Sequence, residues 1–538
     1  MTKWQTKDSL MHLHARLVEH PSITGSNAEI AIAEYIELQL RDISYFRKHR
    51  THLRLHPTSD GRKFVSALVK NGKSRKTVIL ISHFDVVDVE DYGEWKNLAF
   101  HPYDLTNAFY NHIEEFPQGV QEDLKKGEWL FGRGSMDMKA GLAVQMSMLE
   151  RAAEGKFDGN VLLLSVPDEE ANSTGMREAA PVLLQLAKEY ELEYTACLNS
   201  EPMFTNYPGD VNDYIYTGSL GKVLPGFLCY GQETHVGEPF SGLNANYMAA
   251  EITKEVELNI EYCESVEGEV TPPPTNLMQK DLKEEYSVQI PHVAVTNFNV
   301  LFMEKTLDKL TEALLASAQK AADKIEKHYF ERAHQFTKWQ SYTPKKFSVN
   351  VLTYEELFDE AVQQYGEEEL KRRQAYIVAN YKELGDRDLT TRLVYDLAGL
   401  CKDMAPMIVL FYSPPFYPAI SSRHNNTVIK TMKNLKKYGE ENYQLQFKHQ
   451  RYFPGLSDLS FVGLQQPKES LMPLICNMPL FGSQYTLPIQ ELKELNIPVI
   501  NVGPRGKDAH KWTERLDVHY TFEIFPHLLN YTIFQLLQ

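Results

Sequence analysis

The residues best suited to chemistry in this chain are two imidazoles and three carboxylates that lie far apart in the sequence, namely His83, Asp137, Glu170, Glu201 and His510. Imidazole nitrogen and carboxylate oxygen are zinc ligands, and a catalytic zinc ion keeps one coordination position for water. Two ions about 3.5–4 Å apart require a ligand that touches both of them, and Asp137 is the best candidate for this bridge. One ion would then take His83 and Glu201, and the other would take Glu170 and His510.

The charge of this set fits two Zn²⁺ ions. The ions carry four positive charges, and Asp137, Glu170, Glu201 and one hydroxide supply four negative ones. Cobalt or manganese would accept the same oxygen and nitrogen donors. The residues therefore indicate a pair of divalent metal ions more firmly than they indicate zinc.

Two further acids lie beside the expected ligands. Asp85 follows His83 by two residues, and its carboxylate can accept the second ring N–H of that imidazole and fix its tautomer. Glu169 directly precedes Glu170 and is placed to take a proton from a bridging water and pass it to a leaving nitrogen. The set thus predicts metal-assisted hydrolysis.

Each of these features has a structural alternative when it is considered alone. An Asp ahead of a helix, such as Asp137, is usually an N-cap. A His-x-Asp triplet is more often structural than catalytic, the run 168–170 could be a solvated helix start, and His510 could be a hydrogen-bonded core histidine. The metal site is favoured because these residues occur together at the ends of expected strands.

The elements that must position these residues are short apolar runs, each ending in polar residues. They cover residues 77–81, 160–166, 194–199 and 497–502. Helical sequence precedes the first run at 28–40 and lies between the first two at 138–153, as an α/β sheet requires. Ligands of such sheets bind beyond the carboxyl ends of the strands. We therefore expect the polar residues of four strand ends to converge on one cleft.

The pattern changes near residue 218, where a second domain is expected. Strand-like sequence at 223–230, within 287–303 and at 407–412 alternates with helical sequence at 244–259 and 307–333. This order predicts a βαββαβ unit that carries a helical insertion near 335–404. The expected domains are a catalytic first part (1–215), an inserted domain (216–415) and a catalytic second part (416–538).

Composition narrows the classes of function. A net charge of −16 with no dense basic stripe argues against nucleic acid or an anionic membrane as a partner. The five cysteines are scattered and form no CxxC pair, which excludes a thiolate zinc ribbon and a disulfide framework. No apolar run is long enough for a membrane span, and the first residues show no signal-peptide core. The expected location is the cytoplasm.

Several motifs, in order along the chain, resemble one known family. The family is that of the co-catalytic zinc amidohydrolases and exopeptidases, which includes glutamate carboxypeptidase, succinyl-diaminopimelate desuccinylase and aminoacylase. The motifs are Pro21-Ser22-Ile23-Thr24-Gly25, His83-Phe84-Asp85, Gly132-Arg133-Gly134-Ser135-Met136-Asp137-Met138-Lys139, Asp168-Glu169-Glu170, Ser200-Glu201-Pro202, Ser457-Asp458, and Ala509-His510 with Glu514. The resemblance implies two zinc ions on the ligands named above, Glu169 as general base and a cis peptide after Asp137. It also implies a zinc-exopeptidase-like mixed sheet flanked by helices.

The inserted domain looks like the lid of this family, which is ferredoxin-like and also mediates dimerisation. His235 matches the lid histidine that helps to stabilise the tetrahedral oxyanion, often across a dimer interface. Asn244 belongs to the same motif and is a candidate for substrate binding. Without the resemblance, a surface-loop histidine would be the better interpretation of His235. The chain departs from the family pattern at Ala140, where glycine is frequent, at Thr234 and in the length of the helical insertion.

Total length and the long lid resemble the arginine-utilisation proteins of the RocB type. The leading hypothesis is a metal-dependent hydrolase that cleaves an amide bond of a small molecule in arginine catabolism, by attack of a zinc-bridged hydroxide. Both a deacylase of N-acyl amino acids and a small exopeptidase remain open. The alternative is a metal-free protein of the same fold that binds partners through the long insertion.

Overall fold

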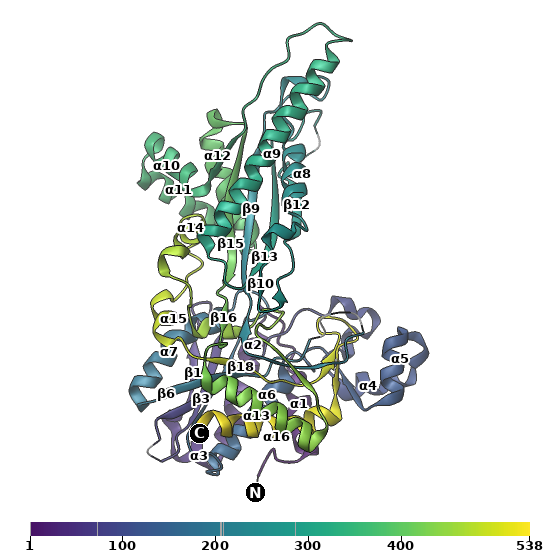
Figure 1. The fold of residues 1–538 in the computed structure, drawn as a ribbon, viewed down its shortest axis with the longest axis vertical. Helices are drawn as coiled ribbons and strands as arrows, with labels where there is room; N and C mark the ends of the chain where they lie inside the picture. Colours follow the sequence, from purple (N-terminus) through teal and green to yellow (C-terminus); the bar gives the residue numbers. More distant parts are fainter. Residues whose placement is uncertain (1, 73, 205–206, 208, 284, 286) are drawn as a thin grey trace. The chain divides into compact units, whose positions relative to one another are not determined.

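The computed structural model describes residues 2–72, 74–204, 207, 209–283, 285 and 287–538, which divide into two compact units. The first unit comprises Met1–Leu220, Pro418–Gln465 and Pro488–Gln538, and the second comprises Gly221–Tyr417 and Gln466–Leu487. Figure 1 shows the elements of both units. None of the helices among these residues is long and apolar enough to cross a membrane.

The first unit is built from helices and strands that alternate along the chain. Its helices are α1 (Lys7–Val18), α2 (Ala28–Arg41), α3 (Ser44–Lys48), α4 (Pro102–Asn111), α5 (Gln118–Lys126), α6 (Lys139–Ala153), α7 (Thr174–Tyr190), α13 (Asn426–Tyr443), α15 (Ile489–Leu495) and α16 (Phe525–Leu537). Its strands are β1 (Leu53–Pro57), β2 (Lys63–Val69), β3 (Lys76–His83), β4 (Trp129–Phe131), β5 (Asn160–Val166), β6 (Glu193–Asn199), β7 (Asp213–Tyr216), β8 (Gly218–Ser219), β16 (Ile420–Ser421), β17 (Phe447–Gln450), β18 (Val499–Asn501), β19 (Gly506–Lys507) and β20 (Arg515–Asp517).

In the described part of this unit, eight strands form one mixed sheet in the order β1-β2-β5-β3-β6-β18-β7-β17. The four neighbours β5, β3, β6 and β18 are parallel, and β5 and most of β3 are buried. Apolar runs such as Val161–Leu164 suit this position because both faces of a central parallel strand are covered. The mixed α/β fold expected from the sequence is confirmed.

Helices cover the sheet and close its core. Side chains from α1, α2, α6, α13 and α16 pack in one buried cluster with residues of β2, β3, β5 and β6. Figure 1 shows α13 and α16 side by side near α6. Leu142, Met146 and Leu149 of α6 belong to this cluster, as their helical spacing predicts. The core thus fixes α6, which begins two residues after Asp137.

The second unit contains its own sheet. Its strands are β9 (Gly221–Tyr230), β10 (Ser265–Val266), β11 (Glu269–Val270), β12 (Thr275–Asp281), β13 (Val293–Phe302), β14 (Asn350–Thr353) and β15 (Met407–Tyr417). Its helices are α8 (Ala245–Val256), α9 (Leu307–Phe336), α10 (Tyr354–Tyr365), α11 (Glu367–Asn380), α12 (Asp386–Leu400) and α14 (Met472–Cys476). Among the described residues, five strands pair in the order β12-β13-β9-β15-β14. Chain order β9-α8-β12-β13-α9-β15 with this strand order is a βαββαβ arrangement.

The stretch predicted as a helical insertion also contributes a strand. β14 pairs in parallel with β15 at one edge of the sheet, and α10, α11 and α12 follow it. Leu357 and Val394 from these helices pack with Leu228 and Val409 of the sheet. The insertion therefore extends and covers the sheet. The sequence did not predict β14 because four residues that pair only with a distant strand carry little local signal.

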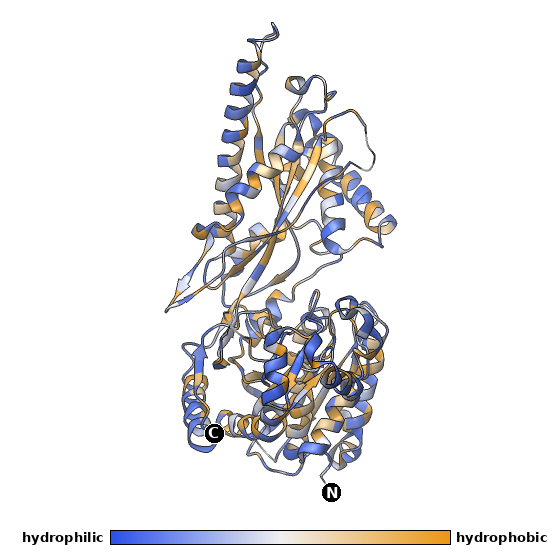
Figure 2. Ribbon diagram, turned by 90° about the vertical axis from the view of Figure 1, so that its right-hand side faces the viewer, coloured by the Kyte–Doolittle hydropathy of each residue, from blue (hydrophilic) through white to orange (hydrophobic). Residues whose placement is uncertain are grey.

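Residues 466–487 belong to the second unit, although the sequence interpretation placed them in the catalytic second part. Asn477 accepts a hydrogen bond from the amide of Tyr412 in β15 at 2.7 Å, and Tyr485 Oη donates to the carbonyl of Phe416 at 3.0 Å. These contacts join a segment late in the chain to the second sheet. Figure 2 shows largely hydrophobic strands within each unit and hydrophilic stretches on the surrounding helices.

Candidate metal centre

His83, Asp137 and Glu201 form a buried group of possible ligands. His83 is the last residue of β3, and its Nε2 lies 3.3 Å from Asp137 Oδ1 and 3.5 Å from Glu201 Oε1. The three side chains are between 1% and 7% exposed. One donor atom from each lies within 4.8 Å of the other two. This spacing is suited to one ion.

Asp137, Glu170 and His510 form a second group of the same kind. Nε2 of His510 lies 3.3 Å from Asp137 Oδ2 and 3.0 Å from Glu170 Oε1. Their donor atoms also lie within 4.8 Å of one another. Asp137 therefore presents one carboxylate oxygen to each group. The five side chains group in the way proposed from the sequence, and their role as metal ligands stays a prediction.

Parallel strands explain three of these positions. β5, β3 and β6 are neighbours that run in the same direction. His83 ends β3, Glu170 follows β5 and Glu201 follows β6. Because the carboxyl ends of parallel strands share one edge of a sheet, these residues meet there.

A small second sheet explains how His510 reaches Asp137. β19 and β20 pair around the loop that carries His510, and β20 pairs with β4. The chain leaves β4 directly into the turn that contains Asp137. The amide of Gly132 donates to the carbonyl of Glu514 at 3.3 Å, which continues this pairing. The two ligand-bearing loops are thus attached to adjacent strands.

Glu514 and Arg133 hold the Asp137 turn from inside the protein. Glu514 Oε1 accepts hydrogen bonds from the amides of Met136 at 3.0 Å and Asp137 at 3.3 Å. Arg133 Nη1 donates to the other carboxylate oxygen of Glu514 at 3.1 Å, and Arg133 Nη2 donates to Asp91 at 2.8 Å. Both Arg133 and Glu514 are buried. The peptide bond between Asp137 and Met138 is cis, as the family resemblance implies.

Asp85 has contacts that differ from those expected. His83 Nδ1 lies 3.0 Å from the main-chain carbonyl oxygen of Asp85 but 3.6 Å from its carboxylate. The carboxylate instead accepts from the amides of Glu169 at 3.1 Å and Glu170 at 3.2 Å. The Asp85 carboxylate still lies within ion-pair distance of the His83 ring, so its role in fixing the imidazole stays a prediction. Asp85 therefore orients the ring through its main chain and holds the Glu169 loop through its side chain.

Several buried acids lie close together in the site, and burial and neighbouring charges shift their pKa values. Burial raises the pKa of Glu201 to about 7, and Asp137 adds to this while His83 opposes it. Burial also raises the pKa of Glu169 well above its ordinary value. Burial would raise the pKa of Asp137, but hydrogen bonds with His510 and His83 outweigh it and hold the pKa far below normal. The same carboxylates raise the pKa of His83 well above 6.5 and that of His510 to about 11.

The donor set fits a pair of divalent cations. Within the described residues, Glu201 Oε1 is buried and makes no hydrogen bond that meets the usual geometry, and it lies 3.5 Å from His83 Nε2. A buried carboxylate oxygen held this loosely is costly, and a bound cation would compensate it. The donors are all oxygen or imidazole nitrogen, and they include two groups of three that share the Asp137 carboxylate. His83, Glu169 and Glu170 form a further group whose donor atoms lie within 4.8 Å of one another. His83 and Glu201 with Asp137 would hold one ion, and Glu170 and His510 with Asp137 would hold the other.

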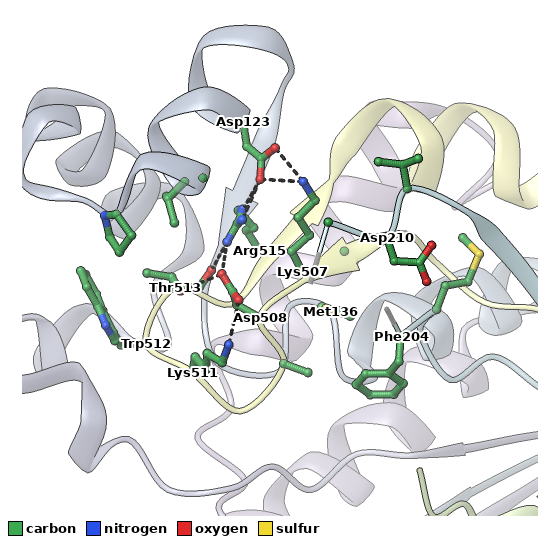
Figure 3. A pocket seen from close by; sticks show the side chains of 18 residues that line it. Asp123, Met136, Phe204, Asp210, Lys507, Asp508, Lys511, Trp512, Thr513 and Arg515 are labelled. Atoms are coloured by element: carbon green, nitrogen blue, oxygen red, sulfur yellow. Dashed lines mark hydrogen bonds and ion pairs between the residues drawn. The ribbon is translucent and has the colours of Figure 1, made fainter. Parts of the chain in front are cut away.

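A cavity of about 570 Å³ borders these loops. Its lining includes Met136 and Ala509, the sequence neighbours of Asp137 and His510, together with the apolar side chains of Met203 and Phe204. Figure 3 shows two groups of paired charges in the wall: Asp123 lies against Lys507 and Arg515, and Asp508 lies against Arg515 and Lys511. Asp210 also belongs to the wall and accepts a hydrogen bond from Tyr214 Oη at 2.8 Å. Apolar groups therefore remain available to a ligand.

His235 and Asn244 lie in the second unit. The His235 side chain is exposed, and its Nδ1 accepts a hydrogen bond from the amide of Gly237 at 3.1 Å. Asn244 is the N-cap of α8 and accepts from the amide of Asn246 at 2.8 Å. Asn244 thus has a local structural task. The roles of His235 at an oxyanion and of Asn244 in substrate binding stay predictions.

Sequence comparison identifies relatives along the whole chain. Residues 79–472 match the profile of peptidase family M20/M25/M40. The YqjN protein of Bacillus subtilis (strain 168) is 53% identical over 535 residues, which are 99% of this chain and 97% of that protein. Protein RocB of the same organism is 34% identical over 539 residues, with 98% and 94% of the two chains covered.

Structure comparison agrees at the level of the fold. An M20 family metallo-carboxypeptidase from Sulfolobus solfataricus, Sso-CP2, superposes with a TM-score of 0.57 at 12% identity and with 98% and 99% of the two chains covered. The protein thus combines a mixed α/β fold with two groups of possible metal ligands that share Asp137. The chain belongs to peptidase family M20/M25/M40. It is thus a metal-dependent hydrolase, and it is similar to RocB over nearly its full length.

Proposed function

We propose that the protein hydrolyses an amide bond of a small substrate, either an N-acyl amino acid or a short peptide, with two zinc ions and Glu169 as the general base. The observation that carries this proposal is the pair of ligand groups that share Asp137, with Glu169 next to Glu170. A pair of divalent ions bound there lowers the pKa of water towards 7 and polarises a substrate carbonyl.

Glu169 would then carry the proton from the attacking water to the leaving group. Glu169 is 9% exposed and its amide is held by Asp85. Its carboxylate would take the proton of the attacking water and deliver it to the leaving nitrogen. The burial that raises the pKa of Glu169 makes it a stronger base in the free protein, and bound cations would lower that pKa again.

The size of the cavity supports a small substrate. A volume of about 570 Å³ falls within the range of small-molecule sites. We propose that its apolar wall receives part of the substrate. The similarity to RocB favours an N-acyl amino acid deacylase in arginine catabolism over a small exopeptidase, and we propose this activity as the first to be measured.

A substrate screen tests this proposal. Purified protein with zinc is given N-acetyl, N-succinyl and N-formyl amino acids, including those of arginine and ornithine, and a matched set of dipeptides. We expect kcat/KM to be at least tenfold higher for one acylated amino acid than for any dipeptide. Hydrolysis of dipeptides alone would make the protein an exopeptidase, and no amide hydrolysis with two zinc ions bound would refute the proposal.

The Glu169→Gln variant tests the role of the base. It keeps the size of the side chain but cannot accept a proton, so we expect kcat to fall at least 10³-fold while two zinc ions remain bound. The matched control is Glu178→Gln, which changes a glutamate that hydrogen-bonds the amide of Ser59 in an exposed position. A variant at Glu169 with a wild-type rate would show that another group transfers the proton.

A further inference from the structure

The turn that carries Glu169 is fastened to the N-terminal segment by a buried carboxylate. Glu29 lies in the first turn of α2 and is fully buried. Its Oε1 accepts a hydrogen bond from the amide of Asp168 at 3.1 Å, and its Oε2 accepts from the amide of Gly25 at 2.6 Å. The Glu29 side chain therefore joins the turn at Gly25 to the turn at Asp168, which lies 139 residues after Glu29.

The Arg62 guanidinium adds ion pairs to this attachment, because it contacts both Glu29 and Asp168. Its Nη1 donates to Glu29 Oε2 at 3.1 Å and to Asp168 Oδ1 at 2.8 Å. Its Nε donates to Asp60 Oδ2 at 3.0 Å. The Arg62 side chain is 13% exposed, and those of Glu29 and Asp168 are 0% and 5% exposed. Charge-assisted hydrogen bonds in such a setting are short and strong, so the three side chains form a fixed unit.

The backbone of Asp168 needs this support. Its φ of 73° lies in the left-handed region, which is unfavourable for a residue with a side chain. The main chain of Asp168 is held by Glu29, which accepts from its amide. Its side chain is held as well, because Asp168 Oδ2 accepts from the amide of Thr174 at 2.9 Å. The conformation of Asp168 sets the direction in which the chain continues into Glu169.

The motif around Thr24 makes a second attachment to the same turn. Thr24 Oγ1 donates to Asp85 Oδ2 at 2.9 Å, and the Asp85 carboxylate accepts from the amides of Glu169 and Glu170. The amide of Thr24 also donates to the carbonyl of Val86 at 3.0 Å. The N-terminal motif noted in the sequence thus contacts the base loop at two points, through Asp85 and through Glu29.

We propose that Glu29 and Arg62 are positioning residues for Glu169, and that they act through Asp168. The inference rests on the proposed function, because it takes Glu169 to be the general base. Neither residue is among the expected metal ligands. A reacting group displaced by about 1 Å can lose on the order of 10²-fold in rate. Loosening the Asp168 turn would therefore reduce turnover while leaving the cavity and the other ligand loops in place.

The test compares Glu29→Ala and Glu29→Gln with the wild-type protein at saturating zinc. We expect kcat to fall about 10- to 100-fold in Glu29→Ala, with KM changed less than about twofold and two zinc ions still bound. Glu29→Gln keeps one acceptor oxygen for the two amides, so we expect it to recover part of the lost kcat. Arg62→Gln should resemble Glu29→Ala, because it leaves two buried carboxylates without their cation.

Hydrogen exchange supplies a measurement that does not depend on activity. Amides between residues 166 and 174 should exchange faster in Glu29→Ala than in the wild type, while those of β3 should be unchanged. The matched control is Arg54→Gln, which breaks an ion pair with Glu189 in the same unit (Arg54 Nη1 donates to Oε2 at 2.8 Å). This control should keep both wild-type kcat and wild-type exchange at residues 166–174.

The outcomes separate this inference from the proposed function. If folded Glu29→Ala and Glu29→Gln keep wild-type kcat, or if exchange at 166–174 is unchanged, the positioning role is wrong. A loss of kcat that simply follows loss of zinc at saturation would also overturn it. If the wild-type protein hydrolyses no amide, the proposed function fails, and the exchange measurement still decides whether Glu29 fixes the turn.

Discussion

At the scale of single residues, the arrangement depends on carboxylates whose two oxygens serve different partners. Asp137 Oδ1 faces His83 and Oδ2 faces His510. Glu514 divides its oxygens between Arg133 and the amides of the Asp137 turn. Asp85 divides its oxygens between the amides of Glu169 and Glu170. The Asp137 turn and the Glu169–Glu170 loop are therefore each tied to a buried acid.

The pair of Arg133 and Glu514 gives a prediction for stability. Arg133→Met removes one member of a buried ion pair and leaves the Glu514 carboxylate poorly compensated, so we expect the unfolding free energy to fall by about 3–5 kcal/mol. The double variant Arg133→Met with Glu514→Gln should recover part of this loss. Urea unfolding of both proteins measures the coupling. A single variant as stable as the wild type would mean that the Glu514 carboxylate does not depend on Arg133 for its compensation.

The sequence predicted part of this residue-level arrangement. The five expected ligands could be found because each follows an apolar run and because their types match metal chemistry. The roles of Glu29 and Arg62 could not be found, since they contact Asp168 across 139 and 106 positions, and a glutamate in a first helical turn usually faces solvent. The contact between His83 Nδ1 and the main-chain carbonyl oxygen of Asp85 could not be predicted either, because sequence patterns identify side chains and not main-chain contacts.

At the scale of elements, the end of β6 comes very close to α6. A Cβ atom placed on Gly141 of α6 would lie 2.3 Å from the carbonyl oxygen of Ser200 and 2.9 Å from its Cβ. Ser200 directly precedes Glu201, so this approach sets how far the Glu201 loop lies from the Asp137 turn. Glycine is required here because the opposing atom is backbone.

Gly141→Ala should therefore destabilise the protein by about 1–3 kcal/mol and weaken zinc binding by displacing Ser200 and Glu201. The matched control is Gly119→Ala in α5, where an added Cβ meets nothing within 4 Å; this change should be neutral or stabilising by up to about 1 kcal/mol. Thermal unfolding and a zinc titration measure both effects. Equal behaviour of the two variants would show that the α6–β6 contact can relax.

His14 of α1 gives a prediction for pH. It is fully buried, and its Nε2 lies 2.9 Å from the carbonyl oxygen of Ser135. Burial lowers its pKa from 6.5 to about 4. The unfolded chain therefore binds a proton at this residue between pH 6.5 and 4 while the folded chain does not, so stability falls as pH falls through this window.

The loss from His14 should be on the order of 3 kcal/mol between pH 6.5 and 4, from a shift of about 2.5 pKa units at 1.36 kcal/mol each. Above pH 6.5 this residue should contribute no pH dependence. Urea unfolding of metal-free protein at several pH values, compared with His14→Gln, measures it. If both proteins lose the same stability between pH 6.5 and 4, His14 does not carry the effect.

Element prediction succeeded where apolar runs are long and failed where pairing is non-local. The predicted runs correspond to β3, β5, β6 and β18, and the predicted helices include α2 and α6. The short strands β4, β19 and β20 were not predicted, although they bring His510 to Asp137. Two or three residues that are extended because distant partners pair with them leave no periodic signal.

At the scale of the whole molecule, the sequence predicted a chain with an inserted domain, and the contacts divide it into two units. Within the second unit, β12 lies at a free edge of the described sheet, and Leu277 in this strand is 48% exposed. A free edge strand is a ready site for pairing with another chain. The homodimer expected from the family resemblance stays a prediction, and we propose β12 as the strand through which two copies pair.

Light scattering tests the dimer. We expect a mass of twice 61.9 kDa for the wild-type protein at micromolar concentration and the mass of one chain for Leu277→Lys, because a charge on an edge strand opposes pairing. Val211→Lys, at an exposed position in the first unit, is the control and should remain dimeric. A wild-type protein with the mass of one chain would contradict the proposed dimer.

The most direct test of the central claim is the number of divalent ions that the protein binds. Metal-free protein is titrated with Zn²⁺ by calorimetry and the bound zinc is counted by elemental analysis after dialysis, for the wild type and for Asp137→Ala. The two ligand groups that share Asp137 predict two zinc ions per chain in the wild type and neither ion at full affinity in Asp137→Ala. A folded wild-type protein that binds no zinc would contradict the account and favour a metal-free binding protein.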